Sequence, residues 1–358
     1  MFNCKLIALA VLIFAASMAR ADKLVVIVGG GTGTDNVPAI RARLIQPFGI
    51  DFDRAGNFYL AELQGQRILK VNTNGTLHIV AGAALKKGNA GDSGPARLAT
   101  FNGMHSLAVT PDGTIYAADT WNNRVRKIDS KSGLITAFAG TGAKGDSGTN
   151  GPASQARLGG IYCVAFNHNF SRLYLTDLDN RKIHFVDMKT GILHHVAGNG
   201  KRGVPENGAD ARNAPLVDPR AACVDRKGNV YILERGGHAL RVVTPGGKIR
   251  TVAGTGKKGN TGDGGNALTA TLNGPKHLCV DLDDNVIIAD TANHVIRKFN
   301  PKDGTIVRLA GTGKKGDSGA GGPPLEVSLY EPHGVFVHPS GTMYIVDSYN
   351  HRVFRWQK

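Results

Sequence analysis

The sequence predicts an all-β protein, a six-bladed β-propeller of four-stranded blades whose ring is closed by the N-terminal strand. Three observations support this fold class. A motif returns at a nearly constant spacing, each copy reads as short strands joined by tight turns, and the copies lack helical periodicity. The spacing is marked by an acidic residue that recurs every 56–58 positions, as Glu62, Asp119, Asp177, Glu234, Asp290 and Asp347. A fixed period of this size indicates a repeat architecture, and four strands per repeat are typical of a propeller blade.

The last copy, residues 331–356, shows the order of strands within one repeat. A Pro turn leads into an alternating apolar run at 335–337, and a Ser-Gly turn leads into a second run that ends at Asp347. After an Asp-x-x-Asn turn, a third run ends at Trp356. Other copies continue into a fourth strand that ends in Ala-Gly, for example at 81–82 and 139–140. The last copy therefore predicts three strands and lacks its fourth.

The missing fourth strand lies at the other end of the chain. Residues 23–30, KLVVIVGG, match the end of a fourth strand but have no first three strands before them. We expect 23–30 to pair with 352–356, so that residues 22–43 supply the outer strand of the last blade and 22–358 form one domain. Closing the ring removes sheet edges that would otherwise template aggregation.

The first 21 residues read as a secretory signal peptide. Lys5 gives the positive start, residues 6–16 the apolar segment, and Ala19-Arg20-Ala21 a small-x-small cleavage site. We expect a secreted protein, or one of the periplasm or cell envelope, with no membrane span after cleavage. Retention of this segment as an anchor is the alternative. The three remaining cysteines, Cys163, Cys223 and Cys279, allow at most one disulfide and favour buried thiols.

The composition is that of a folded and basic protein. With 41% hydrophobic residues the chain is too apolar to be disordered, and with 48 Gly it is too Gly-rich for a helical protein. Its formal net charge of +15 is compatible with an acidic glycan or another polyanionic partner, or with solubility alone. Nucleic acid is not expected, because base-stacking aromatics and nucleic-acid motifs are not evident.

The turn after the second strand resembles that of a known repeat family. Residues 344–353, Tyr-Ile-Val-Asp-Ser-Tyr-Asn-His-Arg-Val, follow the pattern Tyr-x-x-Asp-x-x-Asn-His-Arg-Val of NHL repeats, and similar copies run through residues 22–358. Copies one and four depart from the pattern with Glu62 and Glu234. The resemblance implies six blades around a central channel, but it indicates the fold much better than the function.

The loops that follow the fourth strands carry glycines and lysines. Four of them spell G-x-G-x-x-G, yet none leads into the helix that a dinucleotide site requires, which favours a loop of the repeat. Lys257, Lys258, Lys314 and Lys315 lie in these loops and are expected to crown one face of the ring. They predict an anion-binding rim or, alternatively, a solvated charged edge.

The residues just before the first strands form the column with most chemical content. The first strand of a blade is innermost, so this column should surround one mouth of the channel, and it reads Phe48, His105, Tyr162, Arg220, His277 and His333. The acidic turn residues are expected to open on the same face. In two opposite blades the acidic residue is Glu, at Glu62 and Glu234, where the other four repeats have Asp. This difference indicates either binding positions or sequence drift.

Three histidines at one mouth suggest a metal site. Three His with an open position suit a catalytic zinc. By resemblance to peptidyl-hydroxyglycine amidating lyases, the ligands would be His105, His277 and His333, with Tyr162 as a base and Arg220 as a substrate anchor. Resemblance to gluconolactonase-like propellers, which place carboxylates around a channel calcium, would instead use Glu62 and Glu234. The alternative is that the column simply varies.

The sequence therefore leaves two functions open. The first is an exported binding module that holds a protein, peptide or glycan on its channel-mouth face. The second is a metal-assisted lyase or hydrolase that uses the three His, with one divalent metal in the channel. A complete catalytic motif is not evident, which favours the binding module.

Overall fold

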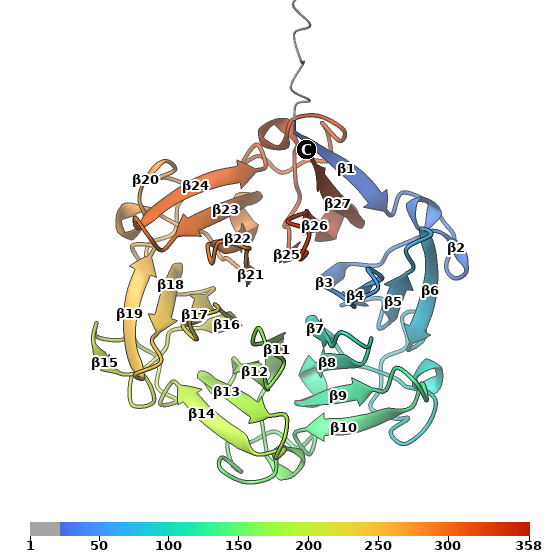
Figure 1. The fold of residues 1–358 in the computed structure, drawn as a ribbon, viewed down its shortest axis with the longest axis horizontal. Helices are drawn as coiled ribbons and strands as arrows, with labels where there is room; N and C mark the ends of the chain where they lie inside the picture. Colours follow the sequence, from blue (N-terminus) through green and yellow to red (C-terminus); the bar gives the residue numbers. More distant parts are fainter. Residues whose placement is uncertain (1–21) are drawn as a thin grey trace, which may run out of the picture.

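The computed structural model describes residues 22–358, which form six β-sheets arranged as blades around a central channel (Figure 1). The predicted all-β, six-bladed fold is confirmed. The predicted signal peptide, residues 1–21, lies outside the described residues. In the part that the structure describes, no helix is long and apolar enough to cross a membrane.

Each blade contains four antiparallel strands, of which the first lines the channel and the fourth lies at the rim (Figure 1). The first blade holds β3 (Pro47–Phe52), β4 (Phe58–Glu62), β5 (Ile68–Val71) and β6 (Thr76–Ala81), the second β7 (Ser106–Val109), β8 (Ile115–Asp119), β9 (Arg124–Ile128) and β10 (Ile135–Ala139), and the third β11 (Ile161–Phe166), β12 (Arg172–Asp177), β13 (Lys182–Asp187) and β14 (Leu193–Ala197). The fourth blade holds β16 (Pro219–Val224), β17 (Val230–Glu234), β18 (Ala239–Val243) and β19 (Lys248–Ala253), the fifth β21 (His277–Val280), β22 (Val286–Asp290), β23 (Val295–Asn300) and β24 (Thr305–Ala310), and the sixth β25 (Gly334–Val337), β26 (Met343–Asp347), β27 (Arg352–Gln357) and β1 (Lys23–Val28).

Short elements complete the connections between these strands. Three two-residue strands, β2 (Val37–Pro38), β15 (Ala209–Asp210) and β20 (Gly265–Asn266), add a fifth strand to the first, fourth and fifth blades. The 3-10 turns are η1 (Ala39–Arg41), η2 (Ala96–Leu98), η3 (Thr120–Asn122), η4 (Ala153–Gln155), η5 (Ala267–Thr269), η6 (Thr291–Asn293), η7 (Pro324–Glu326) and η8 (Ser348–Asn350). Within 22–43, only β1 joins the last blade, because β2 pairs with β6 at the edge of the first blade.

The N-terminal strand closes the ring as predicted. β1 runs antiparallel to β27, with Lys23 opposite Gln357 and Val28 opposite Val353. Leu24 is fully buried in the apolar cluster between the fifth and sixth blades, where Phe354 also lies. Both ends of the described chain are therefore held in one sheet.

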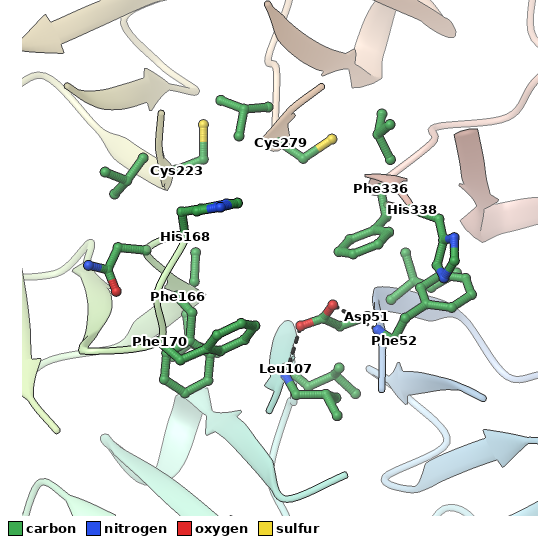
Figure 2. Close-up of a pocket in the computed structure, with 18 of the residues that line it drawn as sticks. Asp51, Phe52, Leu107, Phe166, His168, Phe170, Cys223, Cys279, Phe336 and His338 are labelled. Carbon is green, nitrogen blue, oxygen red and sulfur yellow. Dashed lines mark hydrogen bonds between the residues drawn. The ribbon is translucent and has the colours of Figure 1, made fainter. Parts of the chain in front are cut away.

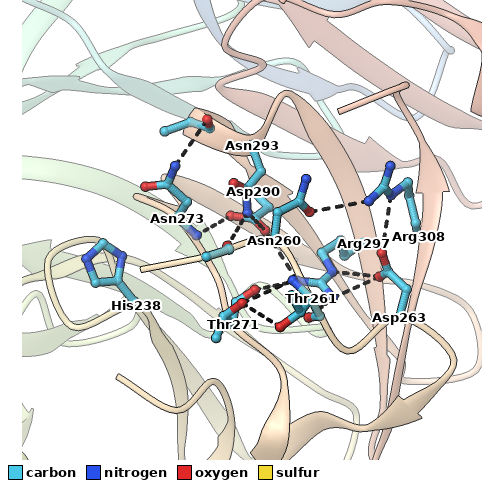
Figure 3. A network of polar contacts seen from close by, with 12 residues as sticks. His238, Asn260, Thr261, Asp263, Thr271, Asn273, Asp290, Asn293, Arg297 and Arg308 are labelled. Carbon is cyan, nitrogen blue, oxygen red and sulfur yellow. Dashed lines mark hydrogen bonds and ion pairs between the residues drawn. The ribbon is translucent and has the colours of Figure 1, made fainter. Parts of the chain in front are cut away.

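In the fifth and sixth blades the turn after the second strand reads Asp-x-x-Asn-His and contacts the next blade, and Figure 3 shows the network around this turn in the fifth blade. Asp290 accepts hydrogen bonds from the backbone N–H of Asn273 and from the amide of Asn293, both at 2.8 Å. The same amide donates to the carbonyl of Gly259 at 2.7 Å, in the loop that leads into this blade. His294, with a left-handed φ of 58°, accepts the N–H of Glu331 in the next blade at 3.1 Å. One turn thus organises its own blade and positions the following one.

The same turn in the last blade contributes to closing the ring. His351 has a φ of 52°, and its Nδ1 accepts the backbone N–H of Gln46 at 3.1 Å, across 305 positions of sequence. The first blade is therefore joined to the last by a side chain as well as by the β1–β27 pairing.

Candidate functional site

The register of the inner strands determines which side chains reach the channel mouth. In each blade one residue of the first strand pairs with the residue just before the buried acid: Gly49, Ser106, Cys163, Ala221, His277 and Gly334. The residues immediately before these form the mouth ring: Phe48, His105, Tyr162, Arg220, Lys276 and His333. Five of the six predicted members are correct, and Lys276 replaces His277.

His277 lies one position too late to belong to the mouth ring. Successive side chains of a strand point to opposite sides, so a slip of one residue moves a side chain to a different surface. The imidazole of His277 instead lies against β25, where its Nδ1 accepts the N–H of Val335 at 3.4 Å. Burial, and then the charge of Arg220, lowers the pKa of His277 to about 4.

The predicted three-His metal site is consequently not formed. His105 and His333 lie at the mouth, with Phe48 between them, but His277 does not join them. Among residues 22–358, no group of three His, Cys, Asp or Glu side chains is arranged to hold a metal ion. The position that the third ligand would need is occupied by the ammonium-bearing side chain of Lys276.

The side chains of the mouth ring form a contiguous belt. Phe48 stacks on His333 with the ring centroids 3.8 Å apart, and its other neighbour, His105, meets it edge-on at 5.5 Å. His105 lies 4.5 Å from the ring of Tyr162, and the guanidinium of Arg220 lies 4.5 Å above that same ring. Phe48, His105, Arg220 and His333 are buried, while Tyr162 is partly exposed.

Arg220 is a buried cation without a carboxylate partner. Only 4% of its surface is exposed, and no ion pair within residues 22–358 includes it. Its hydrogen bond to the carbonyl of Tyr162 is long, at 3.5 Å, and its Nε has no partner in the described structure. Burial, and then the nearby charge of Arg235, lowers its pKa to about 10. The guanidinium thus has hydrogen-bonding capacity left for a ligand.

Lys276 adds a second cation to the mouth ring. Its Nζ lies 3.3 Å from a carboxylate oxygen of Glu331 and 2.9 Å from Nε2 of His333. Nδ1 of His333 donates to the carbonyl of Glu331 at 2.8 Å, so Nε2 is the acceptor for the ammonium. Burial, followed by the charge of Lys276, lowers the pKa of His333 well below its ordinary value, and burial and Arg220 do the same for His105. The mouth therefore carries two cations among neutral imidazoles.

The acidic turn residues do not open on this face, in contrast to the prediction. The six side chains Glu62, Asp119, Asp177, Glu234, Asp290 and Asp347 are all completely buried. One oxygen of each accepts a backbone N–H of the loop leading into its own blade, and in five of the six the second oxygen bonds a turn Asn or an Arg. In Asp177, Oδ2 accepts both the loop N–H and the amide of Asn180, and Oδ1 accepts the backbone N–H of Asn180. These carboxylates satisfy the backbone and are not available to a ligand.

The two Glu exceptions are explained by their glycine neighbours. Glu62 and Glu234 have Gly65 and Gly237 three residues on, where other blades carry the Asn of the turn. A Cβ added at Gly237 would lie 2.6 Å from Oε2 of Glu234, and one at Gly65 would overlap Oε2 of Glu62. The longer acid occupies the space of the missing Asn and bonds an Arg directly. In these two blades Glu in place of Asp therefore compensates for Gly in place of Asn. The prediction that Glu62 and Glu234 bind a ligand is corrected accordingly.

The predicted rim lysines are exposed. Lys257, Lys258, Lys314 and Lys315 all lie at the surface, in the loops between blades. Lys315 is the one of these four whose ammonium lies over an aromatic ring in the described structure, 4.1 Å from the centroid of Tyr330. Through Tyr330 and Tyr349 this lysine is linked to His333 of the mouth ring.

Fold and mouth together define a six-bladed β-propeller whose channel is surrounded at one end by aromatic and cationic side chains. The family model of the NHL repeat matches residues 101–128 and 329–356, which include the turns of the second and sixth blades. These two blades thus match the NHL repeat in sequence.

Relatives share the repeat at low identity. The chain is 25% identical over 342 residues to NHL repeat-containing protein 2 of Gallus gallus, covering 87% of this chain and 46% of that protein. It is 27% identical over 265 residues to the protein SUPPRESSOR OF QUENCHING 1, chloroplastic, of Arabidopsis thaliana, covering 70% of this chain and 24% of that protein. The chain spans less than half the length of these two curated relatives.

A solved structure supports the fold independently. An auxiliary nutrient binding protein from Bacteroides thetaiotaomicron superposes with a TM-score of 0.68, at 14% identity, over 94% of this chain and 76% of that one. At this identity the similarity concerns the fold alone.

Proposed function

We propose that the protein is an exported binding module that holds an anionic group of a protein, peptide or glycan at its channel mouth. The observation that carries this proposal is Arg220, a buried guanidinium to which residues 22–358 offer no carboxylate partner. A buried unpaired charge costs several kcal/mol, and an incoming carboxylate or sulfate would offset that cost. A guanidinium also binds such groups in a bidentate geometry, which makes the interaction specific.

Other features support an anionic ligand. Partly exposed groups give access to the mouth: Tyr162, Lys276, and Arg235, which contacts Asp218 at 2.9 Å. The exposed Trp121 lies edge-on to His105, at 5.6 Å, and could stack on a sugar or peptide group. The net charge of +15 would steer anions toward the protein. A similar fold serves as an auxiliary nutrient binding protein in Bacteroides thetaiotaomicron. The predicted signal peptide supports a secreted, periplasmic or cell-envelope location.

Calorimetric titration with matched ligands tests the proposal. We would compare a short oligogalacturonate with a neutral maltooligosaccharide, and a glutamate-rich peptide with its glutamine counterpart. We expect at least one acidic ligand to bind more than about tenfold tighter than its neutral match. Arg220→Gln should abolish that preference, whereas Lys257→Gln with Lys258→Gln, which neutralises an exposed part of the rim, should change affinity only slightly.

A stability measurement separates a ligand role for Arg220 from a structural one. If the guanidinium is retained for a ligand, Arg220→Met should raise the melting temperature of the unliganded protein, because it removes an unpaired buried charge. A structural role predicts a lower melting temperature. Equal binding of acidic and neutral ligands, or binding of none of the four, would contradict the proposal.

A further inference from the structure

The end of the channel opposite the mouth ring forms a separate cavity (Figure 2). Its volume is about 570 Å³, and its walls come from the inner strands of all six blades. It extends to the turns between first and second strands, where Arg54, His168 and His338 lie. Most of the lining is apolar, with Phe52, Phe166 and Phe336 among the larger side chains. A volume of this size accommodates a small organic molecule.

One carboxylate points into this cavity. Figure 2 shows the side chain of Asp51 directed to the interior, where Oδ1 accepts the N–H of Phe52 and Oδ2 that of Val109, each at 2.7 Å. These bonds fix the carboxylate between the first two blades. No ion pair of residues 22–358 includes Asp51, although its side chain is enclosed by protein and partly open to the cavity. Desolvation raises its pKa to about 7.

The surrounding titratable groups leave Asp51 without a counter-ion. Among the lining residues, β21 contributes His277. The lining also includes three free cysteines, Cys163 of β11, Cys223 of β16 and Cys279 of β21. Asp53 is the other lining carboxylate, and it is engaged by Asn57 and by the hydroxyl of Tyr59. The remaining ionisable lining groups are Arg54, His168 and His338, at the opening of the cavity.

We propose that this cavity binds a small organic cation with an apolar body, with its ammonium group on Asp51. The apolar part would lie along the aromatic wall, where the rings of Phe52 and Phe336 stack 5.1 Å apart. Aromatic faces also attract an ammonium group in a desolvated site. Binding would pair the only lining carboxylate that the fold leaves free of side-chain partners in the described structure. This site is distinct from the mouth ring and does not depend on the anionic ligand proposed there.

A matched pair of probes tests the inference on the full folded chain. Phenylbutylamine is a cation at neutral pH, and phenylbutanol has a similar shape without charge. By calorimetry near pH 8 we expect the amine to bind more than about tenfold tighter than the alcohol. Asp51→Asn should lower the affinity for the amine to that for the alcohol, and it should leave the affinity for the alcohol unchanged. Cys279→Phe, which fills the cavity without altering Asp51, should weaken both.

The wild-type protein provides a test that requires no variant. The amine needs an ionised Asp51, so its affinity should fall roughly tenfold between pH 8 and pH 6 as the carboxylate takes up a proton. The alcohol should not share this dependence. The residual binding of the amine to Asp51→Asn, measured over the same pH range, reports any contribution of the other ionisable groups at the opening. Equal affinities of amine and alcohol, failure of both to bind, or a preference for the amine that survives Asp51→Asn would each overturn the inference.

Discussion

Replacing His184 by Leu should stabilise the protein, and more so in acid. His184 lies in β13, is 2% exposed, and neither ring nitrogen has a hydrogen-bond partner in the described structure. Burial, and then His195, lowers its pKa to about 3. The equivalent position, seven residues after the buried acid, is Leu69 in the first blade and Phe354 in the sixth, so the fold accepts an apolar side chain there.

The magnitude follows from two contributions. At neutral pH, removing two unsatisfied buried nitrogens should gain about 2 kcal/mol. Below pH 6.5 the unfolded chain protonates His184 while the folded chain keeps it neutral, so the wild type loses stability as pH falls toward the folded pKa. At pH 5 this adds about 2 kcal/mol to the advantage of Leu. For a chain of this size, 1 kcal/mol shifts the melting temperature by roughly 1.4 °C.

Calorimetric melting of wild type and His184→Leu at pH 7 and pH 5 measures both contributions. We expect the variant to melt roughly 3 °C higher at pH 7 and 6 °C higher at pH 5. His195→Leu is the matched control, because Nε2 of His195 contacts the carbonyls of Ala197 at 3.1 Å and Gly198 at 2.7 Å and its loss should destabilise. An advantage for His184→Leu that does not grow between pH 7 and pH 5 would refute the reasoning.

Two further predictions concern the repeat and its closure. Gly65→Asn should destabilise by about 1–3 kcal/mol because its side chain overlaps Glu62, and adding Glu62→Asp, which restores the pattern of the sixth blade, should recover most of the loss. Denaturant titration of the wild type, the two single variants and the double variant measures this coupling. Gly246→Ala serves as the control, because an added Cβ there meets no close neighbour. If the losses of the two single variants simply add in the double variant, Glu62 does not compensate for Gly65. Leu24→Ala should cost about 2–5 kcal/mol if the closing strand contributes to global stability, whereas a local fraying of β1 would leave the melting temperature unchanged.

The fold could be predicted from the sequence because the information is local and repeated. The Asp-x-x-Asn turns recur with the repeat, and each encodes its own hydrogen bonds and a left-handed residue such as His294 or His351. The closing strand could be found because an incomplete last repeat and an unmatched first strand complement each other. Neither inference required knowledge of distant contacts.

The site was predicted less well, because its details depend on register and on packing between blades. His277 stands next to Lys276, and the residue type alone favoured the histidine. A useful signal was present: Phe48, Arg220, Lys276 and His333 each follow a proline and precede the buried acid by 14 positions. Asp51 gave no signal, because one aspartate in an inner strand becomes informative only when six strands enclose it.

Charge compensation gives the clearest argument for where this propeller acts. The repeat supplies a partner for its other deeply buried guanidinium groups: Arg67 pairs with Glu62, Arg126 with Asp92, Arg241 with Glu234 and Arg297 with Asp263. Among residues 22–358, Arg220 has no carboxylate partner, and Asp51 has no partner of opposite charge. Both face the channel, one at the mouth and one in the cavity of the other end. Because an unpaired charge is costly in a desolvated site, these two channel-facing groups are the ones that we expect ligands to complete.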